Sequence, residues 1–302
     1  MNILLDAAQT AARLPWPALV DEIEALLHDG AVQVPPRTVL PMAGGAFLFA
    51  MPGCDARVAM TKLISFTPAN VGSATPTIQG DVTVFDVATG TRQLILDGPT
   101  VTGRRTAAVS ALAARRLAPN LAGPMLIVGA GVQGWAHVEV FAAALGVKDF
   151  RIASRRRTSA DALVARAQAL GLRAEVVGDA DAALADCPLV ATCTPASEVV
   201  LRATPRADAF IAAVGAFTPR MVELDAGLCR YIAVQGRIVL DARDAEHEAG
   251  DLLQAGLDVA ALPALADIVR AQKEARDGRG PVLFKSCGWA GWDLAAARLA
   301  LR

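Results

Sequence analysis

A glycine-rich turn between an apolar segment and a helix-like segment constrains this chain more than any other feature. The run Gly129-Ala130-Gly131-Val132-Gln133-Gly134 follows Met125–Val128 and precedes an apolar-periodic stretch over 135–145. A strand, a tight turn and a helix start, in that order, indicate a dinucleotide site. The glycines permit the turn, the approach of a pyrophosphate and close helix packing, and the N–H groups of the helix start face the phosphates. The alternative is an ordinary glycine-rich loop.

The bulk composition indicates a globular protein of about two domains. Of 302 residues, 54% are hydrophobic, mean hydropathy is +0.39 and the net charge is -1, so no global field favours nucleic acid or an acidic membrane. Five cysteines without CxxC or Cys/His spacing suggest a reducing compartment and no metal site. The first residues lack a basic segment before a long apolar core, and no apolar run reaches the ~20 residues of a membrane span. We therefore expect a soluble cytoplasmic protein.

The pattern changes along the chain from strand-rich to alternating. We predict a first domain over 1–118, to which the last segment, 285–302, returns, and a dinucleotide-binding domain over 119–284. In the first part we expect a helix over 17–28 and strands near 46–51, 57–65, 77–87 and 92–96, the last two joined as a hairpin by the turn Ala88-Thr89-Gly90. A helix over 103–117 with Thr102 as N-cap is expected to follow.

From residue 124 the chain alternates between strands and helices. The expected strands cover 125–129, 149–153, 173–177, 188–192, 209–214 and 231–234. Thr158 and Asp161 resemble a capping box, and a strand near 282–286 and a closing helix over 289–302 end the chain. This alternation predicts an α/β fold, a doubly wound Rossmann sheet beside an α+β domain.

The residues after the second alternating strand bear on the choice of cofactor. An NAD site places an acid there for the ribose 2′-OH, whereas this chain reads Ser154-Arg155-Arg156-Arg157. Because serine and arginine can bind a 2′-phosphate, we expect NADPH, with NADH as the other option. Thr194 and Val214, at later strand ends, are further expected cofactor contacts. A solvated basic turn is the alternative, and no wider basic stripe suggests nucleic acid.

Three cations in the first part are candidates for binding an anionic substrate. Arg37 follows two prolines, Lys62 lies inside an apolar strand, and Arg105 lies near a helix start. A lysine in an apolar strand needs an anionic partner or a wet cavity, and an arginine at a helix start opposes the dipole. Taken singly, each is better explained by exposure or a salt bridge than by ligand binding.

Together with the glycine motif, these residues resemble the ornithine cyclodeaminase/μ-crystallin family. The matching pieces occur in family order over nearly the whole chain: Pro36-Arg37, Thr61-Lys62, Gln79-Gly80, Asp86 with Thr89-Gly90, Arg105-Thr106-Ala107-Ala108, the glycine run, Ala213-Val214-Gly215 and Phe284-Lys285-Ser286. The resemblance implies that the domain built from both termini, 1–118 and 285–302, binds the substrate and forms a homodimer, with the Rossmann domain between its two parts. It also implies that Arg37, Lys62 and Arg105, with Thr106 nearby, bind the carboxylate of an amino or imino acid.

Two positions depart from the cyclodeaminase pattern of that family. Phe217 stands where cyclodeaminases carry a catalytic Asp, and Phe49 stands where they carry a Glu that holds the substrate amine. Phenylalanine cannot exchange a proton, so we expect both rings to line a less polar substrate pocket. A register shift that hides the acid is the alternative, because Glu223 and Asp225 follow within ten residues.

A cyclic imino acid fits these constraints, because its C=N bond is already formed. The resemblance to the ketimine reductases of the family implies reduction of Δ1-pyrroline-2-carboxylate or Δ1-piperideine-2-carboxylate to L-proline or L-pipecolate, with Lys62 near the imine as carboxylate ligand or proton source. The alternatives are a cyclodeaminase or an alanine dehydrogenase-like enzyme, or a non-catalytic NADPH-dependent binding protein.

Other polar residues are interpreted more simply. We expect a structural or cofactor-loop role for His137 and a cofactor-side or structural role for Asp293. The acidic run from Asp241 to Asp251 is expected to form a solvated helix face near the domain boundary.

Overall fold

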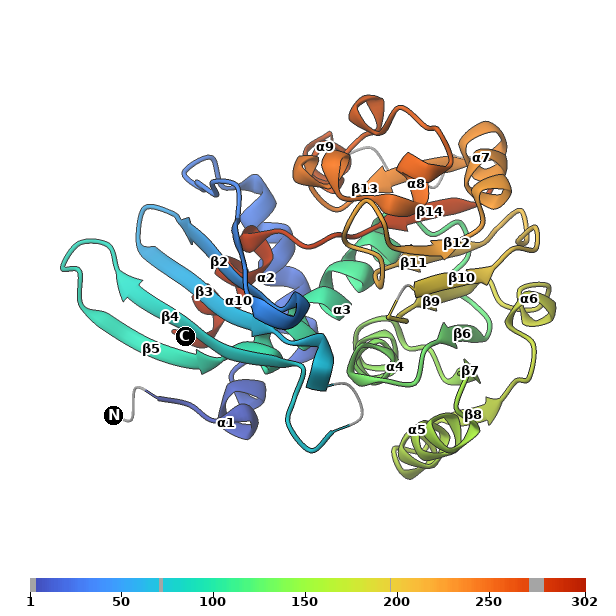
Figure 1. The fold of residues 1–302 in the computed structure, drawn as a ribbon, viewed down its shortest axis with the longest axis horizontal. Helices are drawn as coiled ribbons and strands as arrows, with labels where there is room; N and C mark the ends of the chain where they lie inside the picture. Colours follow the sequence, from blue (N-terminus) through green and yellow to red (C-terminus); the bar gives the residue numbers. More distant parts are fainter. Residues whose placement is uncertain (1–3, 71–72, 196, 272–279) are drawn as a thin grey trace. The chain divides into compact units, whose positions relative to one another are not determined.

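A computed structural model describes residues 4–70, 73–195, 197–271 and 280–302 of the chain. The chain divides into two compact units, Met1–Arg105 with Trp289–Arg302, and Thr106–Gly288. Figure 1 shows an antiparallel sheet in the first unit and a parallel sheet in the second. The predicted combination of a doubly wound parallel sheet and a separate α+β part is confirmed. Among the described residues, no helix is long and apolar enough to cross a bilayer.

The first unit is built on a five-stranded antiparallel sheet in the order β1-β2-β3-β4-β5. Its strands are β1 (Thr38–Pro41), β2 (Phe47–Cys54), β3 (Val58–Phe66), β4 (Ile78–Asp86) and β5 (Arg92–Asp97). Its helices are α1 (Ala7–Ala12), α2 (Trp16–His28) and α10 (Ala290–Ala300), and its 3-10 turns are η1 (Ala43–Gly45) and η2 (Pro68–Asn70). The predicted helix, the four strands and the β4–β5 hairpin are all present, while β1 and α1 were not predicted.

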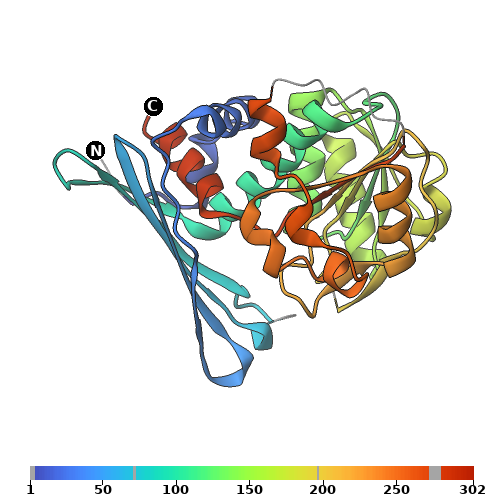
Figure 2. The ribbon, with the colours of Figure 1, turned by 90° about the horizontal axis from the view of Figure 1, so that it is seen from above.

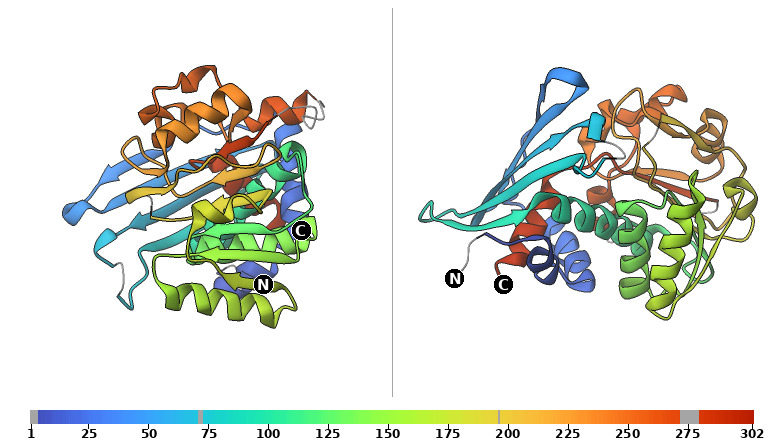
Figure 3. Two further views of the ribbon diagram at one scale, coloured as in Figure 1. Left: turned by 90° about the vertical axis from the view of Figure 1, so that its right-hand side faces the viewer. Right: turned by 60° about the horizontal axis from the view of Figure 1, so that its bottom comes forward.

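Helices cover one face of this sheet, and no helix among the described residues covers the other (Figures 2 and 3). Helix α10 packs on β2, β3 and β4, and α2 packs on α10. Side chains alternate between the two faces of a strand, so the buried residues of β3 point toward α10 and the intervening ones point away. Lys62 lies on the covered face, where it pairs in register with Met51 of β2 and Val82 of β4.

Helix α3 (Gly98–Leu117) runs through the point where the chain divides, since Arg105 belongs to one unit and Thr106 to the other. It begins earlier than its composition predicts, because Asp97 accepts a hydrogen bond from the backbone N–H of Thr100 at 2.8 Å and caps the first turn. The prediction of Thr102 as N-cap is therefore wrong. Thr102 lies inside the helix.

The second unit contains a seven-stranded sheet in the order β13-β14-β11-β9-β6-β7-β8, with only parallel pairs. Its strands are β6 (Met125–Val128), β7 (Asp149–Ala153), β8 (Arg173–Val176), β9 (Leu189–Thr192), β11 (Phe210–Ala213), β13 (Arg237–Leu240) and β14 (Val282–Lys285). A small parallel pair, β10 (Ser197–Leu201) with β12 (Val222–Leu224), lies outside it. The chain order reverses between β6 and β9, which is the crevice where such sheets bind ligands.

Helices lie on both faces of this sheet (Figure 2). They are α4 (Val132–Leu145), α5 (Arg157–Ala169), α6 (Ala180–Ala183), α7 (Ala226–Gln235), α8 (Gly250–Gln254) and α9 (Leu265–Arg270), with 3-10 turns η3 (Arg243–His247) and η4 (Val259–Ala261). The central strands β6, β9 and β11 are buried along their whole length and are apolar except for Thr192 at the end of β9, as expected of a sheet covered on both sides.

Two local predictions for this unit are wrong. Residues 231–234 form the last part of α7 instead of a strand, because Asp225 caps the helix and Leu228, Cys229 and Ile232 form one buried face. The strand of this region is β13, which the sequence did not indicate. The expected Thr158–Asp161 capping box is also absent, since Asp161 pairs with Arg157 on the exposed surface at 2.9 Å.

Candidate active site

The glycine run forms the turn between β6 and α4. Gly129 has φ 115, and a Cβ at Gly134 would lie 2.0 Å from the carbonyl oxygen of Gly129, so the first and third glycines are required by the backbone. A Cβ at Gly131 would have no atom within 4 Å. Gly131 is the N-cap of α4 and makes no side-chain cap, and Val132 is 76% exposed. The first N–H groups of α4 are thus open to an anionic ligand, and this cradle fits a dinucleotide pyrophosphate.

The basic turn after β7 lies in an exposed position. The Arg155 side chain is 81% exposed and lies 3.5 Å from Glu198 of β10, and Arg156 is the N-cap of α5 without a side-chain cap. Arg157 forms an ion pair with Asp161 within α5. Exposed pairs of this kind are weak, so Arg155 can exchange Glu198 for a phosphate.

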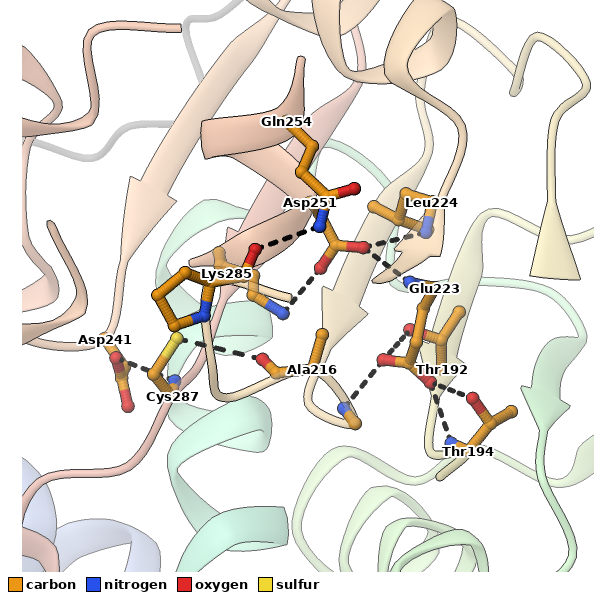
Figure 4. A network of polar contacts seen from close by, with 12 residues as sticks. Thr192, Thr194, Ala216, Glu223, Leu224, Asp241, Asp251, Gln254, Lys285 and Cys287 are labelled. Atoms are coloured by element: carbon orange, nitrogen blue, oxygen red, sulfur yellow. Dashed lines mark hydrogen bonds and ion pairs between the residues drawn. The ribbon is translucent and has the colours of Figure 1, made fainter. Parts of the chain in front are cut away.

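One buried carboxylate joins the loops that leave β9 and β11 (Figure 4). Glu223 accepts hydrogen bonds from Thr192 Oγ1 at 2.9 Å, from Thr194 N and Oγ1 at 2.7 and 2.8 Å, and from Gly215 N at 2.7 Å. Burial raises the pKa of the Glu223 carboxyl, while the donors around it favour its ionised form. Glu223 therefore fixes the backbone at Thr194 and beside Val214, two of the predicted cofactor contacts.

A second layer of charge supports Glu223. Asp251 accepts the backbone N–H groups of Glu223 and Leu224 at 2.6 and 2.9 Å and forms an ion pair of 2.7 Å with Lys285 (Figure 4). Both partners of that ion pair are fully buried. Asp241, also buried, accepts from Ser286 Oγ at 2.8 Å. The prediction that the acidic run is solvated is therefore wrong at Asp241 and Asp251, which satisfy buried backbone and ammonium donors.

The register-shift alternative for the missing acid finds no support in this unit. Phe217 is partly buried and packs against the apolar core beneath the parallel sheet. The Glu223 carboxylate is occupied by its four donors, and Asp225 accepts the N–H groups of Gly227 and Leu228 as the cap of α7. Both nearby acids hold backbone in place.

In the first unit, two of the three predicted cations meet at a buried carboxylate. Asp293, in the first turn of α10, accepts from Lys62 Nζ at 3.0 Å through Oδ1, and its Oδ2 lies 2.9 Å from the same nitrogen. Its Oδ1 lies 3.3 Å from Nε of Arg105. The Lys62, Arg105 and Asp293 side chains are 1%, 6% and 0% exposed. We call these three residues the cation cluster.

Burial dominates the electrostatics of Lys62. It lowers the pKa of the ammonium to about 8, with Asp293 opposing the shift and the Arg105 guanidinium adding to it. Lys62 Nζ also donates to Thr102 Oγ1 at 3.4 Å. The cluster can thus bind a carboxylate at neutral pH and exchange a proton in mildly alkaline solution.

The other predicted substrate residues lie on neighbouring elements. The guanidinium carbon of Arg37 stands 5.8 Å from the ring centre of Phe49, a cation–π contact, and Phe49 lies on the same face of the sheet as Met51 and Lys62. Thr106 is buried and follows Arg105 directly on α3.

His137 has a structural environment on α4. Its Nδ1 lies 2.8 Å from the carbonyl oxygen of Gln133 and its Nε2 lies 3.0 Å from Ser110 Oγ of α3. Burial lowers the pKa of His137 to about 4, so the ring is neutral at pH 7. Within the described residues, no group of three or more His, Cys, Asp or Glu side chains is arranged to hold a metal ion.

Fold and site together define a two-part protein, with a Rossmann-type unit that presents an open helix N-terminus and an antiparallel unit that presents a buried cation cluster. The chain belongs to the ornithine cyclodeaminase/mu-crystallin family, whose sequence profile matches residues 3–301. The family resemblance predicted from the motifs is therefore confirmed.

Individual relatives cover almost the whole chain. A protein of Burkholderia ambifaria named Delta(1)-pyrroline-2-carboxylate reductase 2 is 39% identical over 98% of this chain and 94% of its own length. The ketimine reductase mu-crystallin of Mus musculus is 35% identical over 93% of this chain and 90% of its own. Among solved structures, the Thermococcus litoralis Delta(1)-pyrroline-2-carboxylate reductase in complex with NADH and L-proline has a TM-score of 0.91 at 24% identity, covering 99% and 96% of the two chains.

Proposed function

We propose that this protein is a nicotinamide-dependent oxidoreductase that reduces a cyclic imino acid, Δ1-pyrroline-2-carboxylate or Δ1-piperideine-2-carboxylate, to L-proline or L-pipecolate. The observation that carries the proposal is which charged side chains each of the two units contains and what those side chains contact. The cation cluster offers a buried carboxylate site, while the segment after β11 carries Phe217 and both acids beyond it are bound to backbone and side-chain donors. Deamination of an amino acid requires loss of a hydride from Cα, loss of a proton from the amine and then loss of ammonia, whereas a protonated imino acid only accepts a hydride at C2. The names of the relatives point to the same substrates.

The residues that would hold the cofactor are those of the β6–α4 turn and of the strand ends. Gly131, Val132 and Gln133 would receive the pyrophosphate, and Thr194 and Val214 would be further contacts of the cofactor. When bound, the reduced nicotinamide supplies the hydride that C2 of the imine accepts, with NADP+ as the other product.

Recognition of the substrate falls to the first unit. Lys62 and Arg105 would bind the carboxylate, Arg37 would add a third positive charge, and the Phe49 ring would contact the carbon skeleton. Lys62, with its pKa near 8, can keep the imine nitrogen protonated, so that the C=N carbon is electrophilic when the hydride arrives. The product nitrogen then retains that proton, and the protein contributes mainly position and charge.

For the cofactor we propose NADPH as the preferred form. Ser154, Arg155 and Arg156 follow β7, where a 2′-phosphate would be expected, and the Arg155 side chain is 81% exposed, with Glu198 at 3.5 Å. We place the enzyme in the cytoplasm, because its five cysteines form no disulfide in the described chain.

We also propose a homodimer that covers the helix-free face of the antiparallel sheet. On that face Leu40 pairs in register with Leu48 and Ala50 pairs with Leu63, while Leu40 and Leu63 are 55% and 48% exposed. An exposed apolar sheet face of this kind marks an interaction site. Light scattering on a size-exclusion column should give a dimer, and Leu63→Lys should shift it toward monomer; a monomeric parent protein would contradict the proposal.

The activity is tested with a substrate panel. NADPH oxidation followed at 340 nm should be rapid with the two cyclic imino acids and absent with ornithine. Ammonia released from ornithine would instead establish a cyclodeaminase. Tight NADPH binding without turnover of any imino acid would leave a binding protein and refute the reductase.

A further inference from the structure

Asp293 is the one member of the cation cluster to which the proposed reaction assigns no task. Its side chain is completely buried, it stands at the start of α10, and it contacts two cations that come from β3 and from α3. A negative charge inside a site built to attract a carboxylate would be expected to weaken that attraction. The presence of Asp293 in this site therefore needs a reason.

The contacts of Asp293 supply that reason. Both of its oxygens lie within 3.0 Å of Lys62 Nζ, so the ammonium is held from one side. The contact with Arg105 is made through Nε. Because the guanidinium is a planar fork, a contact through Nε leaves the edge with the two Nη groups for a second, bidentate carboxylate.

Resting on the reductase function proposed above, we propose that Asp293 is a positioning residue: it holds Lys62 and Arg105 as a preset, charged pair that grips the carboxylate of the imino acid. Two cations brought together in a buried site repel each other, and each loses its hydration. Asp293 offsets both effects before the substrate arrives. The first turn of α10 suits the task, since a helix N-terminus stabilises a carboxylate.

The charged groups around Lys62 allow the effect of Asp293 to be measured. Asp293 faces it from α10, Arg105 and Thr102 from α3, and Arg37 from the segment before β1. Burial and the two arginines lower the pKa of Lys62, and Asp293 raises it. Removal of the Asp293 charge must lower the pKa of Lys62 further, so that the ammonium is lost at a lower pH.

The experiment compares the parent protein with Asp293→Asn, using pyrrole-2-carboxylate, a planar ring carboxylate that accepts no hydride, as the probe. Its Kd is measured by calorimetry between pH 6 and 9.5 with NADP+ bound. In the parent, affinity should fall above about pH 8, where Lys62 loses its proton. In Asp293→Asn the fall should begin at least about 1 pH unit lower, the shift that one nearby opposite charge produces. Identical pH profiles would overturn the proposal.

A matched control separates positioning from folding. Asp55 is a buried carboxylate of the same unit that caps the turn before β3 and lies 3.3 Å from Arg298, away from the cation cluster. Asp55→Asn should lower the melting temperature without moving the pH profile of probe binding. If Asp55→Asn moves the profile as far as Asp293→Asn does, Asp293 has no special role.

A second variant covers the case in which Asp293→Asn does not fold. Lys62→Arg keeps a positive charge beside Asp293 but does not titrate, so the alkaline loss of affinity should disappear. Its persistence would show that Lys62 is not the group that Asp293 controls. These results distinguish the role of Asp293 from the proposed function. If the parent protein neither reduces pyrroline-2-carboxylate nor binds the probe, the proposed reductase function is wrong. If the parent is active and the variants behave like it, only the proposed role of Asp293 is wrong.

Discussion

Replacement of Gly134 by alanine is expected to destabilise the nucleotide-binding unit before any cofactor is present. The new Cβ would lie 2.0 Å from the carbonyl oxygen of Gly129 and 3.2 Å from a side-chain carbon of Ile127. Since non-bonded contacts are comfortable only at about 3.5 Å, the start of α4 must move away from the Gly129 oxygen by roughly 1.5 Å. A backbone oxygen cannot rotate aside as a side chain can.

The magnitude follows from two opposing terms. Forcing an extra carbon into a packed site costs about 1–3 kcal/mol, and alanine is favoured over glycine inside a helix by about 1 kcal/mol. A clash of 2.0 Å with a backbone oxygen belongs at the upper end of the steric range, so the net loss is about 2 kcal/mol, which corresponds to a fall in Tm of roughly 4–8 °C. Differential scanning calorimetry without cofactor measures it.

Gly131→Ala is the matched control, because a Cβ there meets no atom within 4 Å and the residue has an ordinary φ of -95. Its Tm should stay within about 1 °C of the parent, but the methyl group would fill the pyrophosphate cradle and raise the Kd for NADPH about tenfold or more, a cost of roughly 1.4 kcal/mol. Tryptophan fluorescence titration reports that Kd. The reasoning is refuted if Gly134→Ala melts with the parent protein or if Gly131→Ala binds NADPH equally well.

Three further outcomes are expected. Arg155→Asp should turn the preference from NADPH toward NADH in steady-state kinetics; retention of the NADPH preference would show that another group reads the 2′-phosphate. Arg298→Met should lower the free energy of unfolding by about 3 kcal/mol in urea, because it leaves the Glu22 carboxylate, 1% exposed, with the exposed Arg302 alone and removes a partner of Asp29 and of Asp55; an unchanged midpoint would contradict this. The pKa of His137 is about 4 in the folded protein, so its contribution to the free energy of unfolding is fully present above about pH 6.5 and is lost as the pH falls toward 4. His137→Gln should therefore lose less stability over that interval than the parent protein. Equal losses would count against a buried neutral ring.

The sequence predicts those parts of the fold that have a local signal. The GxGxxG turn, the apolar strands of the parallel sheet and the β4–β5 hairpin each follow from a pattern within about ten residues. The strand predicted at 231–234 is wrong because a short apolar run fits a strand as well as a helix. The N-cap at Asp225, whose carboxylate binds Gly227 N at 2.7 Å, is the signal that could have decided the matter.

Most contacts among the polar residues of the site have no such local signal. Lys62 and Arg105 were recognised from their types and from the family motifs, but Asp293, more than 180 residues further along, joins them only when α10 packs on β3. Glu223 and Asp251 carry no motif either, and their task of holding two strand-end loops depends on the register of β12 beside β10. Contacts made across such separations come from tertiary packing, so a pattern of neighbouring residues cannot reveal them.

The most direct test of the account follows a deuterium label. The parent protein is supplied with NADPH deuterated at the transferred position of C4 and with Δ1-pyrroline-2-carboxylate, and the product is analysed by mass spectrometry and proton NMR. The account predicts L-proline that carries one deuterium at Cα, formed in equal amount to the NADPH consumed and without ammonia. Proline without deuterium at Cα, or consumption of NADPH without any proline, would contradict it.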